Sequence, residues 1–444
     1  MQTEKLIEES WPNMRNELLI QNTKQFKSEL LEHLENKKIV IWGTGDEGAR
    51  FYNEYCDVIN IIGLTANYTL DTSLSKFKTG SSTLVKNISE FEQNIRDYYF
   101  VISIDYDINY LAVEYQLEQL GLKYGENFVD SLMADAILSR KKIVVTAGDC
   151  LLDALTQGLG MFDAIREKYY IHHFYYLGRS KYFNKLYFRM SQICDVYIMN
   201  RHMDNPSDFY FEPDMLGKHC RLLYVATPEF KGYWPQTPLK EANINPFHIA
   251  PYGRPVDFTM REDVNITKAI KAHQNVDELV KRLLDDKFYT REQVLRNYDV
   301  SIKMIQHAEE GCDVSISDFF MSNAKEKWLA KDYSHYQNIL ILELCRRILV
   351  CLGEKTDYDI SMSKNVLLPF TEMPIYPSVS KALELKFVSE TTKYQIRTYQ
   401  GNQYSIDPYT NCKAYYSIEE MTFEEYIRRY YQYCVSTKQL MEVW

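Results

Sequence analysis

The sequence KKIVVTAGDCLLDALTQGL, at residues 141–159, decides how the central part of the chain folds. Its apolar run Ile143–Thr146 predicts a buried strand, Ala147–Cys150 predicts a tight turn, and the leucines that follow recur at helical spacing. The segment KKIVIWGTGDEGARFYNEY, at residues 37–55, repeats this order with a glycine loop between strand and helix. Strands that alternate with helices form parallel βαβ units. We therefore expect an α/β protein with two parallel-sheet units.

The remaining periodicity extends both units and adds a helical C-terminal part. Further strands are expected at residues 58–64, 97–104, 172–177, 195–200 and 221–227. Helices are expected at 14–35, 108–121, 127–140, 181–192, within 262–310, at 337–352 and from about Met421, where Ser417 and Glu420 would form a capping box. Residues 364–412 are expected to be irregular or short β structure. The predicted divisions are a helical segment 1–36, a Rossmann-like domain 37–140, a second α/β domain 141–355 and a C-terminal extension 356–444 packed on it.

Composition narrows the classes of function. The 444 residues include 51 Lys and Arg against 61 Asp and Glu, a net charge of −10, which argues against a broad nucleic-acid surface. The 9 cysteines form no CxxC pair, so a zinc ribbon has no support and a reducing compartment is favoured over a disulfide scaffold. No apolar run has the length of a membrane span, and the N-terminus lacks a signal-peptide core. We expect a cytoplasmic protein.

The glycine loop of the first unit is Gly43-Thr44-Gly45-Asp46-Glu47-Gly48, a GxGxxG between a strand and a helix. Such glycines let backbone N–H groups approach a diphosphate at a helix N-terminus. The acidic residue that would hold a ribose at the end of the second strand is missing, so NAD is not the expected ligand. The segment resembles the small Rossmann-like domains of bacterial sugar-modifying enzymes. That resemblance implies a sugar-nucleotide module, with Gly43, Gly45 and Gly48 at the ligand, or a scaffold.

A candidate nucleophile stands in the turn of the second unit. Cys150 begins the predicted helix, where exposed N–H groups and the helix dipole favour a thiolate, and its own N–H is a candidate oxyanion donor. The alternative is a small buried hydrophobic side chain at a strand end.

Asp332-Tyr333-Ser334-His335 supplies a candidate base. A carboxylate three residues before a histidine can fix its tautomer and support the imidazolium, although a surface Asp with a capping Ser is the plainer reading. The order of nucleophile first and Asp–His late resembles the SGNH hydrolase and transferase superfamily, with Cys150 in place of serine. By that resemblance Gly178 and Asn200, each after a predicted strand, would complete the oxyanion hole; otherwise they are turn residues.

Residues 141–444 resemble the WcbI-like family of polysaccharide-biosynthesis acetyltransferases. The segments that carry this resemblance are IVVTAGDCLLDAL (143–155), ATPEFKGYWPQ (226–236), INPFHIAPYGR (244–254), DYSHYQNILILELCRRIL (332–349), MPIYPSV (373–379) and MTFEEYIRRYY (421–431). The family implies an SGNH-like three-layer α/β fold, coenzyme A binding and O-acetyl transfer to capsular or related glycans. The chain departs from the family pattern with Asp149 and Leu151 beside Cys150, and with Ser334 and Tyr336 beside His335.

Other polar and aromatic residues would line such a site. Arg179 and Arg201 follow the proposed oxyanion residues and are expected to attract coenzyme A phosphates, as is Arg254, unless they are solvated. The loop Glu229–Pro235 offers aromatic rings to a sugar or an adenine, or packs those rings internally. His172, His173 and His202 have no ligand-like spacing, so no metal is expected.

The leading hypothesis is an acyltransferase that uses acetyl-CoA or another acyl-CoA as donor. Cys150 would take the acyl group as a thioester, and His335, oriented by Asp332, would deprotonate the glycan or nucleotide-sugar acceptor. Direct transfer, with Cys150 only positioning the donor, stays open. The alternatives are an SGNH-type carbohydrate esterase with water as acceptor, and a non-catalytic nucleotide-sugar-binding module that works through Gly43–Gly48.

Overall fold

The N-terminal unit is a parallel four-stranded sheet of order β2-β1-β3-β4. The computed structural model describes residues 19–66, 76–78, 85–104, 108–175, 184–201, 215–227, 229–237, 262–357, 371–403 and 413–443. The unit comprises α2 (Thr23–Asn36), β1 (Lys38–Trp42), α3 (Asp46–Tyr55), β2 (Ile61–Thr65), α5 (Ser89–Glu92), η2 (Ile95–Asp97), β3 (Tyr98–Ile102), α6 (Ile108–Gln119), β4 (Phe128–Asp130) and α7 (Ser131–Leu138). The expected parallel βαβ arrangement of this unit is confirmed, and the inner strands β1 and β3 are buried along nearly their whole length.

The second unit repeats the same strand order, β6-β5-β7-β8, again with every pair parallel. Its elements are β5 (Lys142–Gly148), α8 (Cys150–Leu159), α9 (Asp163–Lys168), β6 (Tyr169–Tyr175), α10 (Asn184–Ile193), β7 (Val196–Asn200) and β8 (Arg221–Val225). In this order the chain leaves β5 toward β6 on one side and later returns to β7 on the other. The carboxyl end of β5, where Gly148 stands, is therefore the point at which ligands of open α/β sheets bind.

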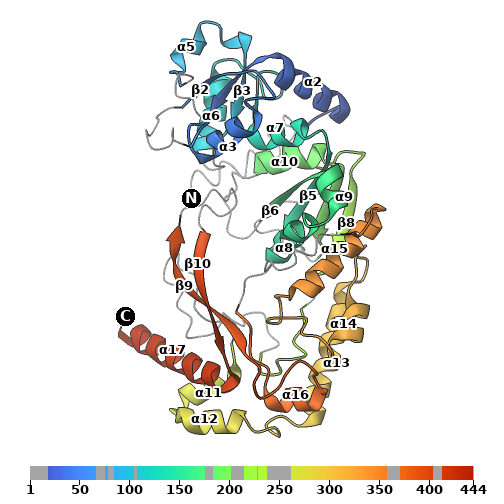
Figure 1. The fold of residues 1–444 in the computed structure, drawn as a ribbon, viewed down its shortest axis with the longest axis vertical. Coiled ribbons are helices and arrows are strands. Elements are labelled where there is room, and N and C mark those ends of the chain that lie inside the picture. Colours follow the sequence, from blue (N-terminus) through green and yellow to red (C-terminus); the bar gives the residue numbers. More distant parts are fainter. Residues whose placement is uncertain are drawn as a thin grey trace.

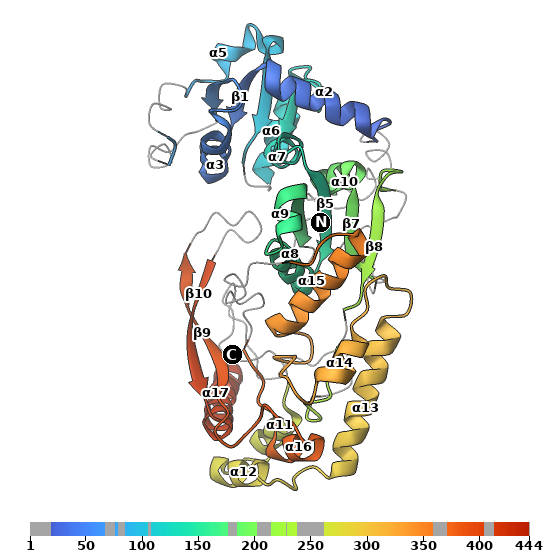
Figure 2. The same cartoon turned by 45° about the vertical axis from the view of Figure 1, so that its right-hand side comes forward.

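The remainder of the described chain is helical apart from one hairpin. It comprises α11 (Val264–Lys271), α12 (Val276–Leu283), α13 (Arg291–Ala308), α14 (Ser317–Asn323), α15 (Asn338–Leu352), α16 (Pro377–Leu383), the antiparallel strands β9 (Tyr394–Gln403) and β10 (Lys413–Met421), and α17 (Phe423–Val443). The N-terminal sheet lies at one end of the molecule, the second sheet in the middle, and α11, α12 and α16 at the other end (Figure 1). The hairpin and α17 stand to one side of α13 and α14 in a second view (Figure 2).

Three expectations for these elements are wrong. Residues 127–140 hold the short edge strand β4 before α7, because Phe128–Asp130 pair with Phe100–Ile102. The stretch after residue 364 contains α16, with Pro377 at its first turn, and the ten-residue strand β9. Ser417 and Glu420 lie within β10 and form no capping box. Thr422 caps α17 instead, through reciprocal hydrogen bonds with Glu425.

Hydrophobic packing continues across the predicted division at residue 140. One buried cluster contains Ile39 and Leu64 of the first sheet together with Val145 and Met199 of the second. Another joins helices α8 and α15 to the C-terminal residues Tyr394 and Tyr426. The two sheets and the C-terminal part therefore share their hydrophobic cores with one another.

A buried ionic cluster, which we call the Glu114 latch, joins the N-terminal unit to α10. Arg189 and Lys185 of α10 each donate to the Glu114 carboxylate of α6 at 2.9 Å. The Arg189 guanidinium also lies 3.4 Å from the centroid of the Tyr124 ring. Burial opposes the ionisation of Glu114, but the two cations outweigh it and lower the pKa of Glu114 to about 2.

We expect Glu114→Gln to lower the free energy of unfolding by about 3–5 kcal/mol, because it leaves buried cations without their anion. The pKa of Glu114 is lowered from 4.5, so the ion pair stabilises the fold above that pH and its contribution is lost as the pH falls toward 2. The difference between wild type and variant, measured by denaturant titration, therefore narrows below pH 4.5.

The matched control is Glu126→Gln, which removes the exposed Lys123–Glu126 pair of the same unit. That change is expected to cost less than about 1 kcal/mol. Equal losses in the two variants would contradict a stabilising role for the latch.

Candidate functional site

Cys150 is the first residue of α8, directly after the turn that ends β5. Asp149 caps the helix, since its Oδ1 accepts a hydrogen bond of 2.9 Å from the backbone N–H of Leu151. The leucines behind Cys150 face the core, and Leu151, Leu152 and Leu155 are all buried. Cys150 itself is partly exposed and packs at the edge of that core, as a reactive cysteine at a helix N-terminus should.

Asn200, at the end of β7, belongs to the same turn. Its side chain donates a hydrogen bond to Asp149, and its buried Oδ1 would lie 3.1 Å from a Cβ added at Gly148. Burial raises the pKa of Asp149, while the bonds from Leu151 and Asn200 and the charge of His335 oppose that rise.

Asp332 and His335 form the second half of the site. Asp332 Oδ2 lies 2.7 Å from Nδ1 of His335, and Oδ1 accepts from the backbone N–H groups of Ser334 and His335 at 2.8 and 3.0 Å. The turn is closed by a bond of 2.8 Å from the Lys331 N–H to the His335 carbonyl. Asp332 and His335 are only 3% and 6% exposed, so this pairing is shielded from solvent.

The two turns lie close together. α8 starts at Cys150, α15 starts three residues after His335, and the two helices pack on each other, with Cys345 Sγ donating to the Leu155 carbonyl at 3.4 Å. His335 is close enough to Asp149 to lower the pKa of that carboxyl group. Asp149 and Cys150 are close enough to the Tyr336 hydroxyl to raise its pKa. These mutual effects indicate that Cys150, Asn200, Asp332 and His335 lie in one region, beside the starts of α8 and α15.

Sequence reasoning gave no role to two buried groups beside this region. The Tyr336 hydroxyl has no hydrogen-bond partner among the described residues, and burial, then Glu229, Asp332, Asp149 and Cys150, raise its pKa. Lys231 is 3% exposed, with Nζ 4.7 Å from the centroid of the Tyr333 ring. Tyr336 could have been noted from the sequence because it directly follows His335. Lys231 stands among aromatic residues, which gave no sign that its amine is buried.

The aromatic loop Glu229–Pro235 does not offer its rings to a ligand. Phe230, Tyr233 and Trp234 are fully buried, and Phe230 packs edge-on against Tyr233. The indole N–H of Trp234 donates to the Met373 carbonyl at 3.2 Å. The expectation of a sugar or adenine platform is therefore wrong for these three rings, and the alternative of internal packing is correct. Their contribution is to support the turn, through a bond from the Phe230 N–H to the Tyr333 carbonyl.

The glycine loop of the first unit has a clear packing role. A side chain at Gly43 would collide with the Ser103 carbonyl, and one at Gly48 with the Gly43 carbonyl, whereas Gly45 faces open space. Glu47, in the first turn of α3, is buried and accepts hydrogen bonds from Arg50 and Ser131. Acidic residues at this helix start repel phosphate. The loop joins β1 to α3 in the N-terminal unit, whereas Cys150 begins α8 in the second unit.

The other predicted contacts divide into two groups. Gly178, Arg179, Arg254 and His202 lie outside the described residues. Arg201 is exposed, and its guanidinium lies against Gly311 after α13. His173 is buried, with Nδ1 2.9 Å from Thr146 Oγ1.

Over the part of the chain that the structure describes, no group of three metal-binding side chains is present and no helix is both long and apolar enough to cross a membrane.

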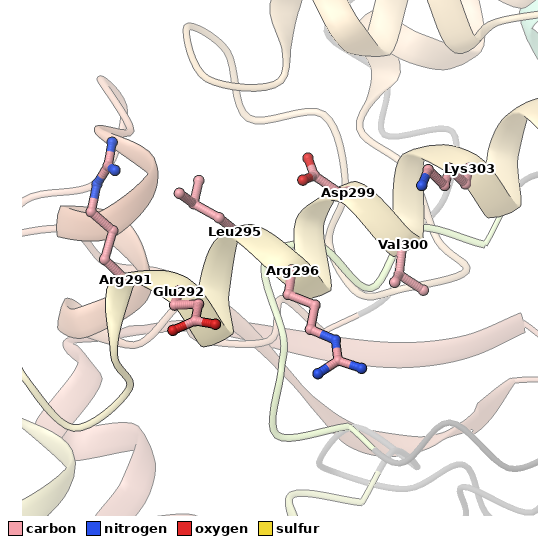
Figure 3. Close-up of a pocket in the computed structure, with 7 residues that line it drawn as sticks. All are labelled: Arg291, Glu292, Leu295, Arg296, Asp299, Val300 and Lys303. Carbon is pink, nitrogen blue, oxygen red and sulfur yellow. The ribbon is translucent and has the colours of Figure 1, made fainter.

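An open hollow runs along α13, lined by Arg291, Glu292, Leu295, Arg296, Asp299, Val300 and Lys303 (Figure 3). Leu295 and Asp299 project to one side of the helix and Arg296 and Val300 to another. Charges of both signs that do not converge are typical of a solvated helix face. The hollow shares no residue with the Cys150 and His335 turns.

The comparisons with known proteins agree with this architecture. Residues 214–356 match the family model of the polysaccharide biosynthesis enzyme WcbI. This segment includes Asp332 and His335, and it confirms the resemblance to WcbI that the sequence indicated. A solved structure of native WcbI, described as lacking a disulfide bond between coenzyme A and a cysteine, superposes with a TM-score of 0.50 at 15% identity. The alignment covers 66% of this chain and 90% of that WcbI chain, so the two share a fold. A comparison with curated proteins finds no match.

We expect Gly148→Ala to distort the turn that carries Cys150. A Cβ there would lie 2.8 Å from Leu152 Cγ and 3.1 Å from Asn200 Oδ1, and Leu152 is fixed in the core. Such overpacking costs roughly 1–3 kcal/mol of unfolding free energy, measurable by denaturant titration.

Gly45→Ala is the matched control, because the same methyl group there meets nothing within 4 Å. It is expected to change stability by less than about 1 kcal/mol. If the Gly148→Ala protein is as stable as the Gly45→Ala protein, the turn can accommodate a methyl group at residue 148, which would contradict the close contacts described here.

Proposed function

We propose that this protein is an O-acyltransferase that moves an acyl group, most simply acetyl, from coenzyme A to a sugar hydroxyl in surface-polysaccharide biosynthesis. The observation that supports the proposal is that Cys150 begins α8, while His335, whose Nδ1 is bonded to Asp332, lies just before α15, the helix that packs on α8. The match to the WcbI family model and the coenzyme A named for the solved WcbI structure support it. A thiol, an oriented imidazole and an amide are the groups that thioester exchange needs, so the described residues fit an acyl-CoA substrate.

In the first step, His335 takes the Cys150 proton at Nε2, the nitrogen that does not bond Asp332. The Cys150 sulfur attacks the thioester carbonyl, and the C–S bond to coenzyme A breaks as the tetrahedral intermediate collapses. His335 returns the proton to the departing thiolate. One thioester replaces another, so the exchange is close to balanced in energy. The partial positive charge at the start of α8 favours the thiolate before attack.

In the second step, His335 takes the proton of the acceptor hydroxyl. The sugar oxygen attacks the Cys150 thioester, the new C–O ester bond forms, and the C–S bond to Cys150 breaks. His335 gives its proton to the Cys150 sulfur and the site returns to its starting state. Asp332 stabilises the imidazolium in both steps because its carboxylate stays bonded to Nδ1.

The tetrahedral intermediates need donors for their oxyanion. We assign this to the Cys150 N–H, the Asn200 side chain and Gly178, with Arg179, Arg201 and Arg254 toward the phosphates of coenzyme A. Asn200 is held ready by its bond to Asp149. A water molecule in place of the sugar would turn the same steps into an esterase, so the acceptor decides between the two activities. The proposed acceptor is a glycan or nucleotide sugar, and the proposed location is the bacterial cytoplasm.

The deciding experiment is intact-protein mass spectrometry after brief exposure to acetyl-CoA. Wild type is expected to gain one acetyl group, and Cys150→Ala none. In His335→Ala the adduct should form slowly and then persist when a glycan acceptor is added, because no base remains to activate the hydroxyl. Free acetate from wild type without acceptor would favour the esterase.

Cys56→Ala is the matched control, since it removes a partly exposed cysteine of the N-terminal unit and should leave the adduct intact. An acetyl group that survives in Cys150→Ala would refute the covalent route. Absence of both adduct and coenzyme A binding in wild type would refute the proposed function.

We expect Asp332→Asn to lower the rate of transfer by roughly 10³–10⁴ with little loss of stability. An amide keeps an acceptor for the backbone N–H groups but presents a donor to Nδ1, which forces the other tautomer on His335. Steady-state transfer assays and a denaturant titration measure the two effects. Asp163→Asn, at an exposed acid on α9, is the control. Equal rates in both variants would exclude Asp332 from the mechanism.

A further inference from the structure

A pair of thiols lies at the amino edge of the second sheet. The Sγ atoms of Cys194 and Cys220 are 3.3 Å apart. Cys194 lies two residues before β7 and Cys220 directly before β8, and the strands pair in parallel with Val196 opposite Arg221. The sheet itself therefore holds the two cysteines side by side.

Local hydrogen bonds fix both cysteines. The Cys194 N–H donates to the Met190 carbonyl at 3.0 Å, and its thiol lies 3.2 Å from the Ser191 carbonyl. The Cys220 N–H donates to the Gly217 carbonyl at 2.8 Å. A disulfide has an S–S length of about 2.05 Å, so the sulfurs would need to approach by little more than 1 Å, roughly the reach of a small side-chain rotation.

The two thiols differ in access to solvent. Cys194 is fully buried, whereas Cys220 is partly exposed. Burial raises the pKa of the Cys194 thiol, and Cys220 and Asp195 raise it further while Lys27 opposes them. An oxidant in solution therefore meets Cys220 first, and Cys194 is placed to react with whatever Cys220 becomes.

We propose that Cys194 and Cys220 form a disulfide-forming site that reacts with low-molecular-weight disulfides such as oxidised glutathione. The Cys220 thiolate attacks one sulfur of oxidised glutathione, forms a mixed disulfide and releases one glutathione thiolate. The Cys194 sulfur attacks the Cys220 sulfur, its proton passes to the departing sulfur, and the second glutathione is released as a thiol. Two protein thiols are oxidised, and one oxidised glutathione is reduced to two glutathione molecules.

The bond is expected to raise the stability of the fold. It closes a loop between residues 26 positions apart, which contains Asn200 and Arg201. Cys150 stands at the carboxyl edge of the sheet, and five-residue strands such as β7 span about 16 Å between the two edges. A crosslink of this kind restricts the unfolded chain, so the oxidised protein should melt at a higher temperature.

The test uses the full chain, reduced and then incubated in buffers with increasing ratios of oxidised to reduced glutathione. Free thiols are blocked with N-ethylmaleimide, the protein is digested without reduction, and the peptides are identified by mass spectrometry. We expect one crosslinked species joining the peptides of Cys194 and Cys220, a higher melting temperature, and reversal of both by dithiothreitol.

Two variants separate the roles of the cysteines. In Cys194→Ser, Cys220 should keep its glutathione adduct, because no second thiol displaces it. In Cys220→Ser, Cys194 should stay reduced. A persistent glutathione adduct at Cys220 of wild type, or no crosslink at a ratio that oxidises Cys220, would overturn the proposal. Both outcomes are measured in wild type, so they hold even if a variant does not fold.

Discussion

The candidate site depends on a single carboxylate. Asp332 accepts two backbone hydrogen bonds through one oxygen and orients His335 through the other, so the same group both folds the turn and sets the tautomer of the base. The arrangement is buried, which strengthens each bond and makes a lost one costly. The backbone of the turn therefore sets the position of the imidazole, and the packing of α15 on α8 places the turn near the start of α8.

The two sheets show how one strand–turn–helix pattern serves two purposes. In the N-terminal unit, Gly43 and Gly48 allow backbones to touch, and Glu47 is engaged by Arg50 and Ser131. In the second unit, only one glycine remains in the turn, and it leaves room for the Asn200 side chain beside the proposed nucleophile. Strand order is the same in both sheets, so topology does not separate a packing turn from a reactive one. The two turns differ instead in the side chains that contact them from neighbouring segments.

Local patterns were sufficient for most of the fold and for the chemical groups of the site. Apolar runs marked β1, β3, β5, β7 and β8, and the three-residue spacing of Asp332 and His335 predicted the hydrogen bond that joins them. The expectations that were wrong concern features that depend on contacts between distant segments of the chain. The three residues of β4 are a strand only because β3 lies beside them. Trp234 could not be assigned to core or surface from its local sequence, because its indole N–H bonds Met373, 139 residues further along the chain. The burial of Lys231 and Tyr336 was not visible in the local sequence either.

The Glu114 latch has a consequence for how such a chain can be assembled in evolution. Its anion belongs to the first unit and its cations to the second; Glu114 and Arg189 are buried, whereas Lys185 is partly exposed. A gene fragment that encodes only the portion from residue 141 onward would produce a protein with Arg189 and Lys185 stranded on a newly uncovered helix. A replacement of the leading unit would keep this stabilising ion pair only if it supplied an acid at the same place.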